Sequence, residues 1–228
     1  MKYLLTVLIA LLAGFAGAAA FSFSGLGNEN TRTYLAENPV VLRDMIEGLQ
    51  ASEAQERLAQ VEGDVKTPFQ GAVLGNPQGT KTLVKFTDYS CGYCRASVED
   101  VDRLIAANPD LRVIVRERAI FASSEAAARM GLAAAAEGKY DEFYHAMFAL
   151  GVPTAEKIAS AARTAGIDME AAREFGASQQ VTAELVRNDE LARQLGIPGT
   201  PSWVYGDTVF EGAVGYQQLS EIVASNEG

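Results

Sequence analysis

The chain has 228 residues, of which 29 are acidic and 19 are basic, and its formal net charge is −10 at pH 7. An acidic protein of this kind is repelled by nucleic-acid phosphates and by anionic membrane surfaces, so the composition excludes these as partners. The chain contains two cysteines, Cys91 and Cys94. A framework of several disulfides, which is common in small exported proteins, is therefore excluded as well.

The N-terminus has the pattern of a secretory signal peptide. Lys2 precedes an apolar run over residues 3–15, and the small residues AGAAA follow at 16–20. The apolar run is shorter than the roughly 20 residues that cross a bilayer, which favours a cleaved signal over a membrane anchor. We therefore expect residues 1–20 to direct export of the protein.

Residues 21–64 are expected to form an N-terminal extension. The segment 21–30, FSFSGLGNEN, is rich in Gly, Ser and Asn and predicts a flexible leader. The pattern over 31–61 is helical, with Asn38 as a candidate cap and Pro39 suited to the first position of a helix. Four residues form an apolar stripe at helical spacing, namely Leu42, Met45, Ile46 and Leu49. This apolar stripe needs a cover, either the main body of the chain or the same stripe of another subunit.

The main body is expected to begin near residue 65 with a strand, a helix and a second strand. The runs KTLVKFT at 81–87 and LRVIVRE at 111–117 are the expected strands, and residues 96–107 between them form an amphipathic helix. A βαβ unit of this kind predicts parallel pairing through a right-handed crossover. Both cysteines would then lie between the first strand and the helix.

The rest of the chain consists of a helical block followed by a return to strands. Residues 119–195 are rich in Ala, Glu and Arg and are divided by glycine-containing turns, which predicts several helices. A strand at 202–205, a turn, a second short strand and a helix from about residue 216 follow. Because 65–118 and 196–228 flank the helices, the expected fold class is α/β, with one mixed sheet, an inserted helical domain and an N-terminal helical extension.

The motif Cys91-Gly92-Tyr93-Cys94 at a helix start favours redox chemistry. Unpaired N–H groups and the positive end of the helix dipole favour a thiolate on Cys91, which is the predicted nucleophile at an exposed tip. Cys94, one helical turn later and facing inward, is predicted to attack the mixed disulfide that Cys91 forms with a substrate.

The cysteine pair has two alternative interpretations. An inert structural disulfide would stabilise the fold little, because it closes a very short loop. A zinc site needs more ligands than two cysteines and His145, which is the single histidine of the chain. No metal is therefore expected, and His145 is expected to be a surface or packing residue of a helix.

Three runs resemble the DsbA-type thiol-disulfide oxidoreductases of the periplasm, namely LVKFTDYSCGYC, RVIVRERAIFASSEAAARMGLAAAAEGKYDEFYHAMF and GIPGTPSWVYGDTVFEGAVGY. The resemblance covers residues 65–225 or so. It implies a thioredoxin-like fold interrupted by a helical domain, and a periplasmic enzyme that forms or rearranges disulfides without a metal or organic cofactor. The implied partners are unfolded or misoxidised exported proteins and a membrane protein that resets the Cys91–Cys94 pair.

By position, the resemblance makes Cys91 the attacking cysteine, Cys94 its buried partner and Pro201 a cis-proline beside them. A cis bond at Thr200-Pro201 would hold backbone groups near Cys91 for strand-like pairing with an extended substrate. Pro198 is expected to be trans. The predicted substrate-binding residues are Gly92, Tyr93, Thr200 and Pro201.

Lys85 departs from the pattern of the family, which often has an acidic residue six positions before the first cysteine. Alternation along LVKFT places Lys85 on the opposite face from Val84 and Phe86. A charged Lys85 at the buried end of the site would stabilise a thiolate and make the disulfide more oxidising. The alternative is a lysine that bends out to water and has no catalytic role.

The direction of electron flow has two expected alternatives. Gly-Tyr between the cysteines and Thr before the proline resemble the DsbC-type isomerases, whereas the helical insertion resembles the oxidases. Some DsbA-like proteins of the ScsC type oligomerise through N-terminal helices, and residues 31–61 would do so here. A homo-oligomer favours isomerase or reductase activity, and a monomer favours net oxidation.

A hypothesis of another class is a noncatalytic chaperone-like module in which the disulfide only braces the fold.

Overall fold

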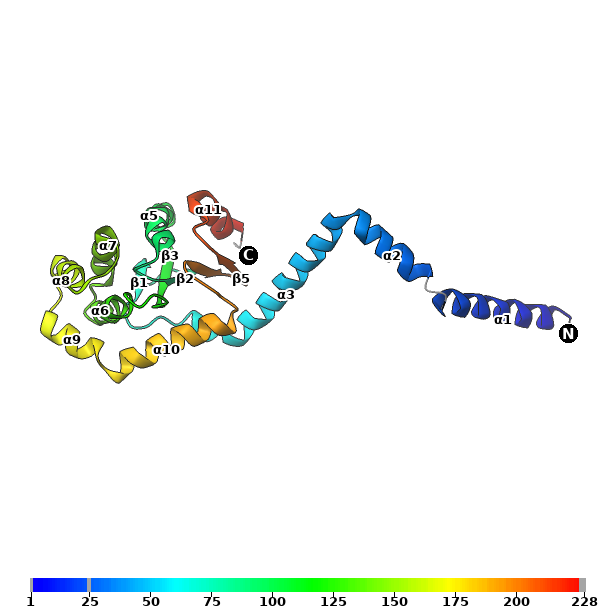
Figure 1. Ribbon diagram of the computed structural model, residues 1–228, viewed down its shortest axis with the longest axis horizontal. Helices are drawn as coiled ribbons and strands as arrows, with labels where there is room; N and C mark the ends of the chain where they lie inside the picture. Colours follow the sequence, from blue (N-terminus) through cyan, green and yellow to red (C-terminus); the bar gives the residue numbers. More distant parts are fainter. Residues whose placement is uncertain (1, 24–25, 226–228) are drawn as a thin grey trace. The chain divides into compact units, whose positions relative to one another are not determined.

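The computed structural model describes residues 2–23 and 26–225 and divides into two compact units, Met1–Ser52 and Glu53–Gly228 (Figure 1). The boundary lies within a helix and differs from the boundary at residue 64 that the sequence predicts. The reason is that the end of this helix buries Leu58 and Val65 in the core of the second unit.

The N-terminal unit is helical in its described residues. Helix α1 spans Lys2–Phe23, α2 spans Leu26–Glu37, and α3 spans Pro39–Val65 and continues into the second unit. No helix of the described ranges 2–23 and 26–225 is both long and apolar enough to cross a membrane.

The expectation of a flexible leader over 21–30 is wrong for the residues of this segment that the structure describes. Residues 21–23 belong to α1 and residues 26–30 to α2, while 24 and 25 lie outside the described residues. Six of the twelve residues of α2 are strong helix formers, namely two Leu, two Glu, one Arg and one Ala.

Helix α3 begins at Pro39, as the sequence predicts, because proline has a fixed φ and lacks the N–H that would be unpaired there. The side-chain amide of Asn38 donates to the Tyr34 carbonyl of α2 over 2.8 Å, so Asn38 closes the preceding helix. The four side chains of the apolar stripe are 45–61% exposed.

The second unit is built on a five-stranded sheet with the order β1-β3-β2-β4-β5. Its strands are β1 Val73–Gly75, β2 Lys81–Thr87, β3 Leu111–Glu117, β4 Ser202–Tyr205 and β5 Thr208–Glu211. β2 and β3 are parallel, whereas the other neighbours are antiparallel. The sequence predicted every strand except β1, which is too short to show an alternating pattern.

Two helices connect β2 to β3, where the sequence predicted one. Helix α4 spans Gly92–Ala96 and α5 spans Val98–Ala107, and Ser97 separates them. One face of the central strands packs against α5 and the C-terminal helix α11, Gly215–Ser225, as Figure 1 shows. This face contributes Leu83, Val113 and Val115 to the larger core. Side chains from the same strands alternate between the two faces, so the opposite face presents Val84, Phe86 and Ile114.

The predicted helical insertion is present as five helices. They are α6 Glu125–Ala136, α7 Tyr140–Leu150, α8 Ala155–Thr164, α9 Met169–Gly176 and α10 Gln179–Gln194. Helix α7 contacts β1, and α10 lies on the same face of the sheet as the end of α3 (Figure 1). Gly138 and Gly151 end α6 and α7 with φ of 70° and 78°, a conformation that glycine adopts without strain.

Candidate active site

Cys91 lies at the start of α4, in the position that caps the helix. Its backbone is extended, with φ −75° and ψ 117°, and its sulfur accepts a hydrogen bond from the N–H of Cys94 over 3.3 Å. The thiol of Cys91 donates to the carbonyl oxygen of Thr200 over 3.2 Å. The structure therefore brings together three of the predicted site residues from two distant parts of the chain.

The exposed tip of the motif is formed by other residues than Cys91. Tyr93 is 72% exposed and Gly92 is exposed, whereas Cys91 retains 6% exposure and Cys94 none. The expectation that Cys91 itself forms the tip is wrong, because the chain at Thr200 lies over its sulfur.

The Thr200-Pro201 peptide bond is cis. Pro198 is trans, and the described part of the chain contains no second cis bond. Pro201 is buried directly before β4, which pairs with β2, the strand that leads to the cysteines. The cis-proline that the resemblance implied is thus at the expected position beside Cys91.

Cys94 is fully buried, and its surroundings act on its ionisation in opposite directions. Burial raises the pKa of the Cys94 thiol to about 11, while the hydroxyls of Thr200 and Thr87 and the backbone of Asp88 lower it. The hydroxyl oxygens of Thr87 and Thr200 are buried and have no hydrogen-bond partner among the described residues. Sequence analysis did not identify Thr87 as a residue of the site.

Lys85 is fully buried, and both cysteines are among the groups that act on its charge. Its Nζ donates to the hydroxyl of Tyr144 over 2.6 Å and lies 5.1 Å from the ring centre of Trp203 and 5.9 Å from that of Phe148. The alternative of a lysine that bends out to water is therefore wrong. Burial lowers the pKa of Lys85 from 10.5 to about 8, and Cys94 is the foremost group whose negative charge raises it.

Glu117 is a second buried ionisable group that sequence analysis missed. Its Oε1 accepts from the hydroxyls of Tyr89 over 2.8 Å and Tyr140 over 2.7 Å, and its Oε2 is buried without a partner in the described residues. Burial raises the pKa of Glu117 from 4.5 to about 8. The alternation in RVIVRE places Glu117 on the face of Val113 and Val115, and this signal could have found it.

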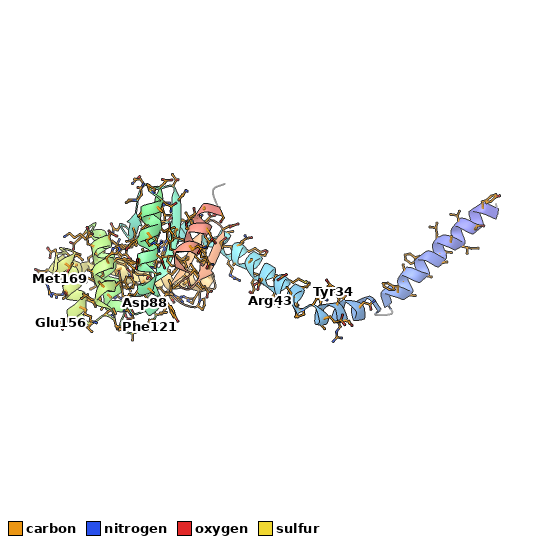
Figure 2. All side chains as sticks on the ribbon, turned by 90° about the horizontal axis from the view of Figure 1, so that it is seen from above. Tyr34, Arg43, Asp88, Phe121, Glu156 and Met169 are labelled. Atoms are coloured by element: carbon orange, nitrogen blue, oxygen red, sulfur yellow. The ribbon has the colours of Figure 1, made fainter. Side chains whose placement is uncertain are left out.

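The loop before Cys91 is fixed by the carboxylate of Asp88. Its Oδ1 accepts from the N–H of Ser90 over 2.6 Å, and its Oδ2 accepts from the N–H groups of Ile120 and Phe121 over 2.8 and 3.1 Å. Figure 2 labels Asp88 and Phe121. The Asp88 carbonyl also accepts from the N–H of Cys91 over 3.1 Å. These bonds hold the turn that presents Cys91 against the segment that leads into α6.

His145 lies on α7 away from the cysteine pair. Its ring nitrogens bond to Oδ1 of Asp102 over 2.9 Å and to the carbonyl of Asp141 over 2.8 Å, so it links α7 to α5 as a packing residue. The side-chain carboxylate of Asp141, whose Oδ1 lies 3.3 Å from Nδ1, is the main cause that raises the pKa of His145 to about 9. In the part of the chain that the structure describes, no three His, Cys, Asp or Glu side chains form a metal-binding group.

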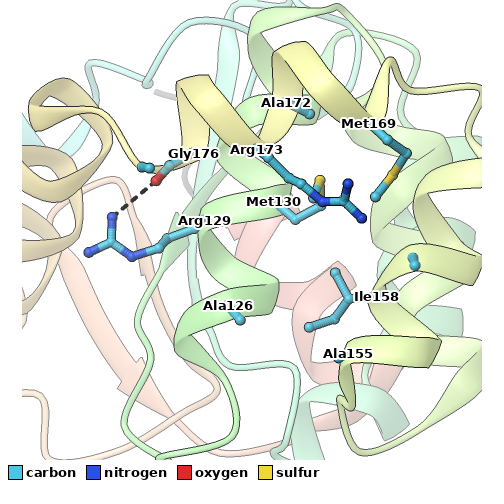
Figure 3. Close-up of a pocket in the computed structure, with 11 residues that line it drawn as sticks. Ala126, Arg129, Met130, Ala155, Ile158, Met169, Ala172, Arg173 and Gly176 are labelled. Atoms are coloured by element: carbon cyan, nitrogen blue, oxygen red, sulfur yellow. Dashed lines mark hydrogen bonds between the residues drawn. The ribbon is translucent and has the colours of Figure 1, made fainter.

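A separate hollow of about 320 Å³ lies among helices α6, α8 and α9 (Figure 3). Its lining is mainly apolar, with Arg129 and Arg173 as the charged side chains. Arg129 donates to the carbonyl of Gly176 over 3.0 Å. None of the predicted site residues lines this hollow, so it is not part of the cysteine site.

Comparisons with known proteins identify the family. The model of the DSBA-like thioredoxin domain matches residues 82–224. A thioredoxin-like oxidoreductase from Silicibacter pomeroyi DSS-3 is 38% identical over 67% of this chain and 90% of its own, with a TM-score of 0.64. A search of curated proteins gave no match.

Two further solved structures are similar over more of this chain. A linker-deletion mutant of ScsC from Proteus mirabilis is 25% identical over 87% of this chain and 92% of its own, with a TM-score of 0.73. The thiol-disulfide exchange protein alpha-DsbA2 from Wolbachia pipientis is 26% identical over 78% of this chain and 97% of its own, with a TM-score of 0.70. The predicted fold is confirmed, and the chain belongs to the DSBA-like thioredoxin-domain family of thiol-disulfide oxidoreductases.

Proposed function

We propose that the protein is a periplasmic thiol-disulfide oxidoreductase whose active site is the Cys91-Gly92-Tyr93-Cys94 motif. The observation that carries this proposal is the position of the Cys91 sulfur. It accepts from the Cys94 N–H and donates to the Thr200 carbonyl beside the cis-proline, and Cys91 as a residue is 6% exposed. This places the Cys91 sulfur at the start of a helix and next to the cis-proline, as the nucleophile of disulfide exchange requires.

The reaction proceeds through a mixed disulfide. The Cys91 thiolate attacks one sulfur of a substrate disulfide, the substrate S–S bond breaks, and the other substrate sulfur leaves as a thiolate. Cys94 then loses its proton and attacks the Cys91 sulfur. The Cys91–Cys94 bond forms, and the second substrate sulfur leaves as a thiolate and takes up a proton. The substrate gains two electrons in this direction, and the reverse sequence forms a substrate disulfide.

Lys85 is proposed to assist the resolving step through its charge. A protonated Lys85 attracts the negative charge on Cys94 more strongly than that on Cys91, because Cys94 is the foremost anionic group acting on it. The effect therefore concerns Cys94 first, whereas the sequence suggested a general thiolate effect. Replacing Lys85 with Gln should make the disulfide less oxidising, and equilibration with a thiol buffer of known potential measures this. An unchanged potential would refute the role of Lys85.

The substrates and partners follow from the location and the chemistry. Residues 1–20 are proposed as a cleaved signal for export, and the substrates are exported proteins with unformed or incorrect disulfides. Thiol-disulfide exchange moves electrons between sulfurs, so no metal or organic cofactor is proposed for the reaction. Continuous turnover requires a redox partner in the membrane that resets the Cys91–Cys94 pair. Gly92, Tyr93, Thr200 and Pro201 are the proposed contact residues for the substrate.

Reduction of insulin and refolding of a scrambled disulfide protein test the proposed activity. The wild-type protein should be active in at least one assay, and Cys91→Ala should be inactive with an unchanged circular dichroism spectrum. Equal behaviour of the two proteins would contradict an enzyme and support a noncatalytic module in which the disulfide braces the fold.

Isomerase or reductase activity in a homo-oligomer is favoured by one specific observation. The apolar stripe of Leu42, Met45, Ile46 and Leu49 is 45–61% exposed in the single chain, and such a helix face gains stability when it is covered. Sedimentation of the mature protein with and without residues 21–52 tests this, because the part of α3 from Glu53 onward belongs to the second unit. An oligomer that dissociates on removal of the segment supports the isomerase, whereas a monomer in both cases supports net oxidation.

A further inference from the structure

Two threonines near the cysteine pair have buried hydroxyls without a hydrogen-bond partner in the described residues. Thr87 is the last residue of β2 and shares its sheet face with Lys85, while Thr200 directly precedes the cis-proline. Both Oγ1 atoms are buried, and neither has a hydrogen-bond partner among the described residues. Thr87 follows Phe86, which pairs with Ser202 of β4, so both threonines lie at the ends of β2 and β4 near the cysteines, where the Thr200 carbonyl accepts from the Cys91 thiol over 3.2 Å. Both hydroxyls and the backbone of Asp88 lower the pKa of the Cys94 thiol.

A buried hydroxyl without a partner destabilises the folded state, because it gives up its hydrogen bonds to water. A valine has nearly the same shape and would fill either position without this loss. Native structures rarely leave such groups unpaired, and an exception calls for a functional explanation. A partner that forms in another state of the protein provides one. The neutral thiol of Cys94 is a weak acceptor, whereas its thiolate would accept strong charge-assisted hydrogen bonds.

We propose that the hydroxyls of Thr87 and Thr200 and the backbone N–H of Asp88 form a donor set that stabilises the Cys94 thiolate in the resolving step. This inference rests on the proposed function and adds catalytic residues to it. Thr87 is buried and cannot contact a substrate from the surface, so its role is confined to Cys94. Preorganised donors aimed at a developing negative charge are a general means of lowering a reaction barrier.

The donor set acts at a defined point in the exchange. Once Cys91 carries the substrate sulfur, the thiol of Cys94 releases its proton to solvent and its thiolate takes hydrogen bonds from the three donors. It then attacks the Cys91 sulfur, and the Cys91–substrate bond breaks as the Cys91–Cys94 bond forms. The departing thiolate takes up a proton. Because burial raises the pKa of Cys94 to about 11 even with these groups in place, ionisation is the difficult part of this step.

Other ionisable groups around Cys94 are also expected to influence its ionisation. Lys85 of β2, Cys91 at the start of α4 and Tyr144 of α7 interact directly with its charge. Glu117 of β3 and Asp102 of α5 act on Lys85. A test of the donor set must therefore compare variants that leave these five groups unchanged.

Reaction of the reduced protein with dithiobis(nitrobenzoate) separates the two steps. Attack by Cys91 releases one coloured nitrothiolate and leaves the other on Cys91 as a mixed disulfide. Attack by Cys94 then releases the second nitrothiolate and forms the Cys91–Cys94 disulfide. Stopped-flow absorbance at a series of pH values gives the rate of each phase, and the second phase reports the ionisation of Cys94.

The variant Thr87→Val should slow the second phase about tenfold near neutral pH, which is the effect of one hydrogen bond to a charged group. Its pH midpoint should move upward, and the first phase should keep the wild-type rate. Thr87→Ser retains the hydroxyl and should restore the second phase. Thr208→Val on β5 is the matched control, because Thr208 is an exposed strand residue, and both phases should be unchanged.

The outcomes separate this inference from the proposed function. A second phase within about twofold of the wild-type rate in Thr87→Val, with the first phase intact, would overturn the donor set. A wild-type first phase as slow as that of free cysteine would instead overturn the proposed nucleophile. If circular dichroism shows that Thr87→Val does not fold, Thr87→Ala compared with Thr87→Ser gives the same decision.

Discussion

Two buried cations on opposite faces of the sheet differ in the partners that surround them. Arg116 of β3 is 1% exposed, and Lys85 of β2 is fully buried. Arg116 donates to Glu184 over 2.8 Å, to Asn188 over 3.2 Å and to backbone carbonyls at the end of α3, including that of Val65 over 3.0 Å. Lys85 donates to the hydroxyl of Tyr144, and the ion pairs of the described residues do not include it.

The comparison shows that burial alone does not assign a role to a charge. The guanidinium of Arg116 joins β3, α10 and the end of α3, so its charge is compensated and serves the fold. The ammonium of Lys85 lacks a carboxylate partner in the described chain, and burial brings its pKa close to neutrality. Both cysteines are among the anionic groups that act on this charge, so Lys85 can stabilise a cysteine sulfur that ionises.

The largest expected effect is the loss of stability in Arg116→Met. The change leaves the carboxylate of Glu184 and several carbonyls buried without a donor, which should lower the free energy of unfolding by about 3–5 kcal/mol. Chemical denaturation at pH 7 measures this value. Arg193→Ala, which removes an exposed pair with Glu190, is the control and should change stability by less than about 1 kcal/mol.

Lys85→Met should behave in the opposite way to Arg116→Met when its stability is measured by chemical denaturation. The fall in pKa from 10.5 to about 8 corresponds to a destabilisation of roughly 3 kcal/mol for the charged form, so the variant should be as stable as wild type or more stable at pH 7. The pKa of Lys85 is lower in the folded state than in the unfolded state, so the stability of the wild-type protein rises between about pH 8 and 10.5. The difference in stability between Lys85→Met and wild type should therefore become smaller over this pH range. A large loss of stability in Lys85→Met, equal to that in Arg116→Met, would contradict the comparison.

The next effect concerns the pH dependence of stability at Glu117. The pKa of Glu117 is about 8 in the folded state and 4.5 ordinarily. The stabilisation that Glu117 gives the folded state is therefore fully present below pH 4.5 and is lost as the pH rises through 8. Wild type should lose roughly 3 kcal/mol relative to Glu117→Gln between pH 4.5 and 7. The amide oxygen of Gln still accepts from both tyrosines, which isolates the effect of the charge.

Denaturant unfolding of both proteins across this pH range measures the difference. The exposed variant Glu190→Gln controls for the loss of one carboxylate and should follow wild type. Parallel pH profiles for wild type and Glu117→Gln would show that Glu117 is ionised in the folded protein at pH 7 without a penalty.

A smaller effect is expected where α6 lies against the carboxylate of Glu117. A methyl group at Gly131 would lie 2.9 Å from Glu117 Oε1 and 3.0 Å from the hydroxyl of Tyr89, so Gly131→Ala should destabilise the protein by about 1–3 kcal/mol. Gly63 in α3 has no atom within 4 Å of the same position, and Gly63→Ala should stabilise by about 0.5–1 kcal/mol. Thermal denaturation of the two variants compares them. Stabilisation by both substitutions would show that α6 is free to move away from Glu117.

Most of the fold could be predicted because its signals are local. The alternation in KTLVKFT and LRVIVRE gave the bounds of β2 and β3, and the cysteines lie at the strand–helix junction as expected. The helix over 26–30 was missed because glycine and asparagine suggested a leader, although no tertiary contact is needed for a segment with sufficient helix propensity. β1 was missed because a strand of three residues has no readable period.

The site was only partly predictable because its buried residues act through contacts that are distant in sequence. Cys91, Cys94 and Pro201 belong to recognisable motifs, and the structure places them together. Glu117 gains its role from Tyr89 and Tyr140, which come from a loop and from the helical insertion. The sequence of β3, which contains Glu117, does not show that either tyrosine is its hydrogen-bond partner.

The central claim is that Cys91 attacks substrate disulfides and that Cys94 resolves the product. The most direct measurement is the expression of Cys94→Ala in cells, followed by nonreducing electrophoresis after acid quenching of thiols. The account predicts mixed disulfides with exported proteins that disappear on reduction and are much less abundant in Cys91→Ala, which retains Cys94. Equal amounts of mixed disulfide in Cys91→Ala and Cys94→Ala, or their complete absence in Cys94→Ala, would contradict it.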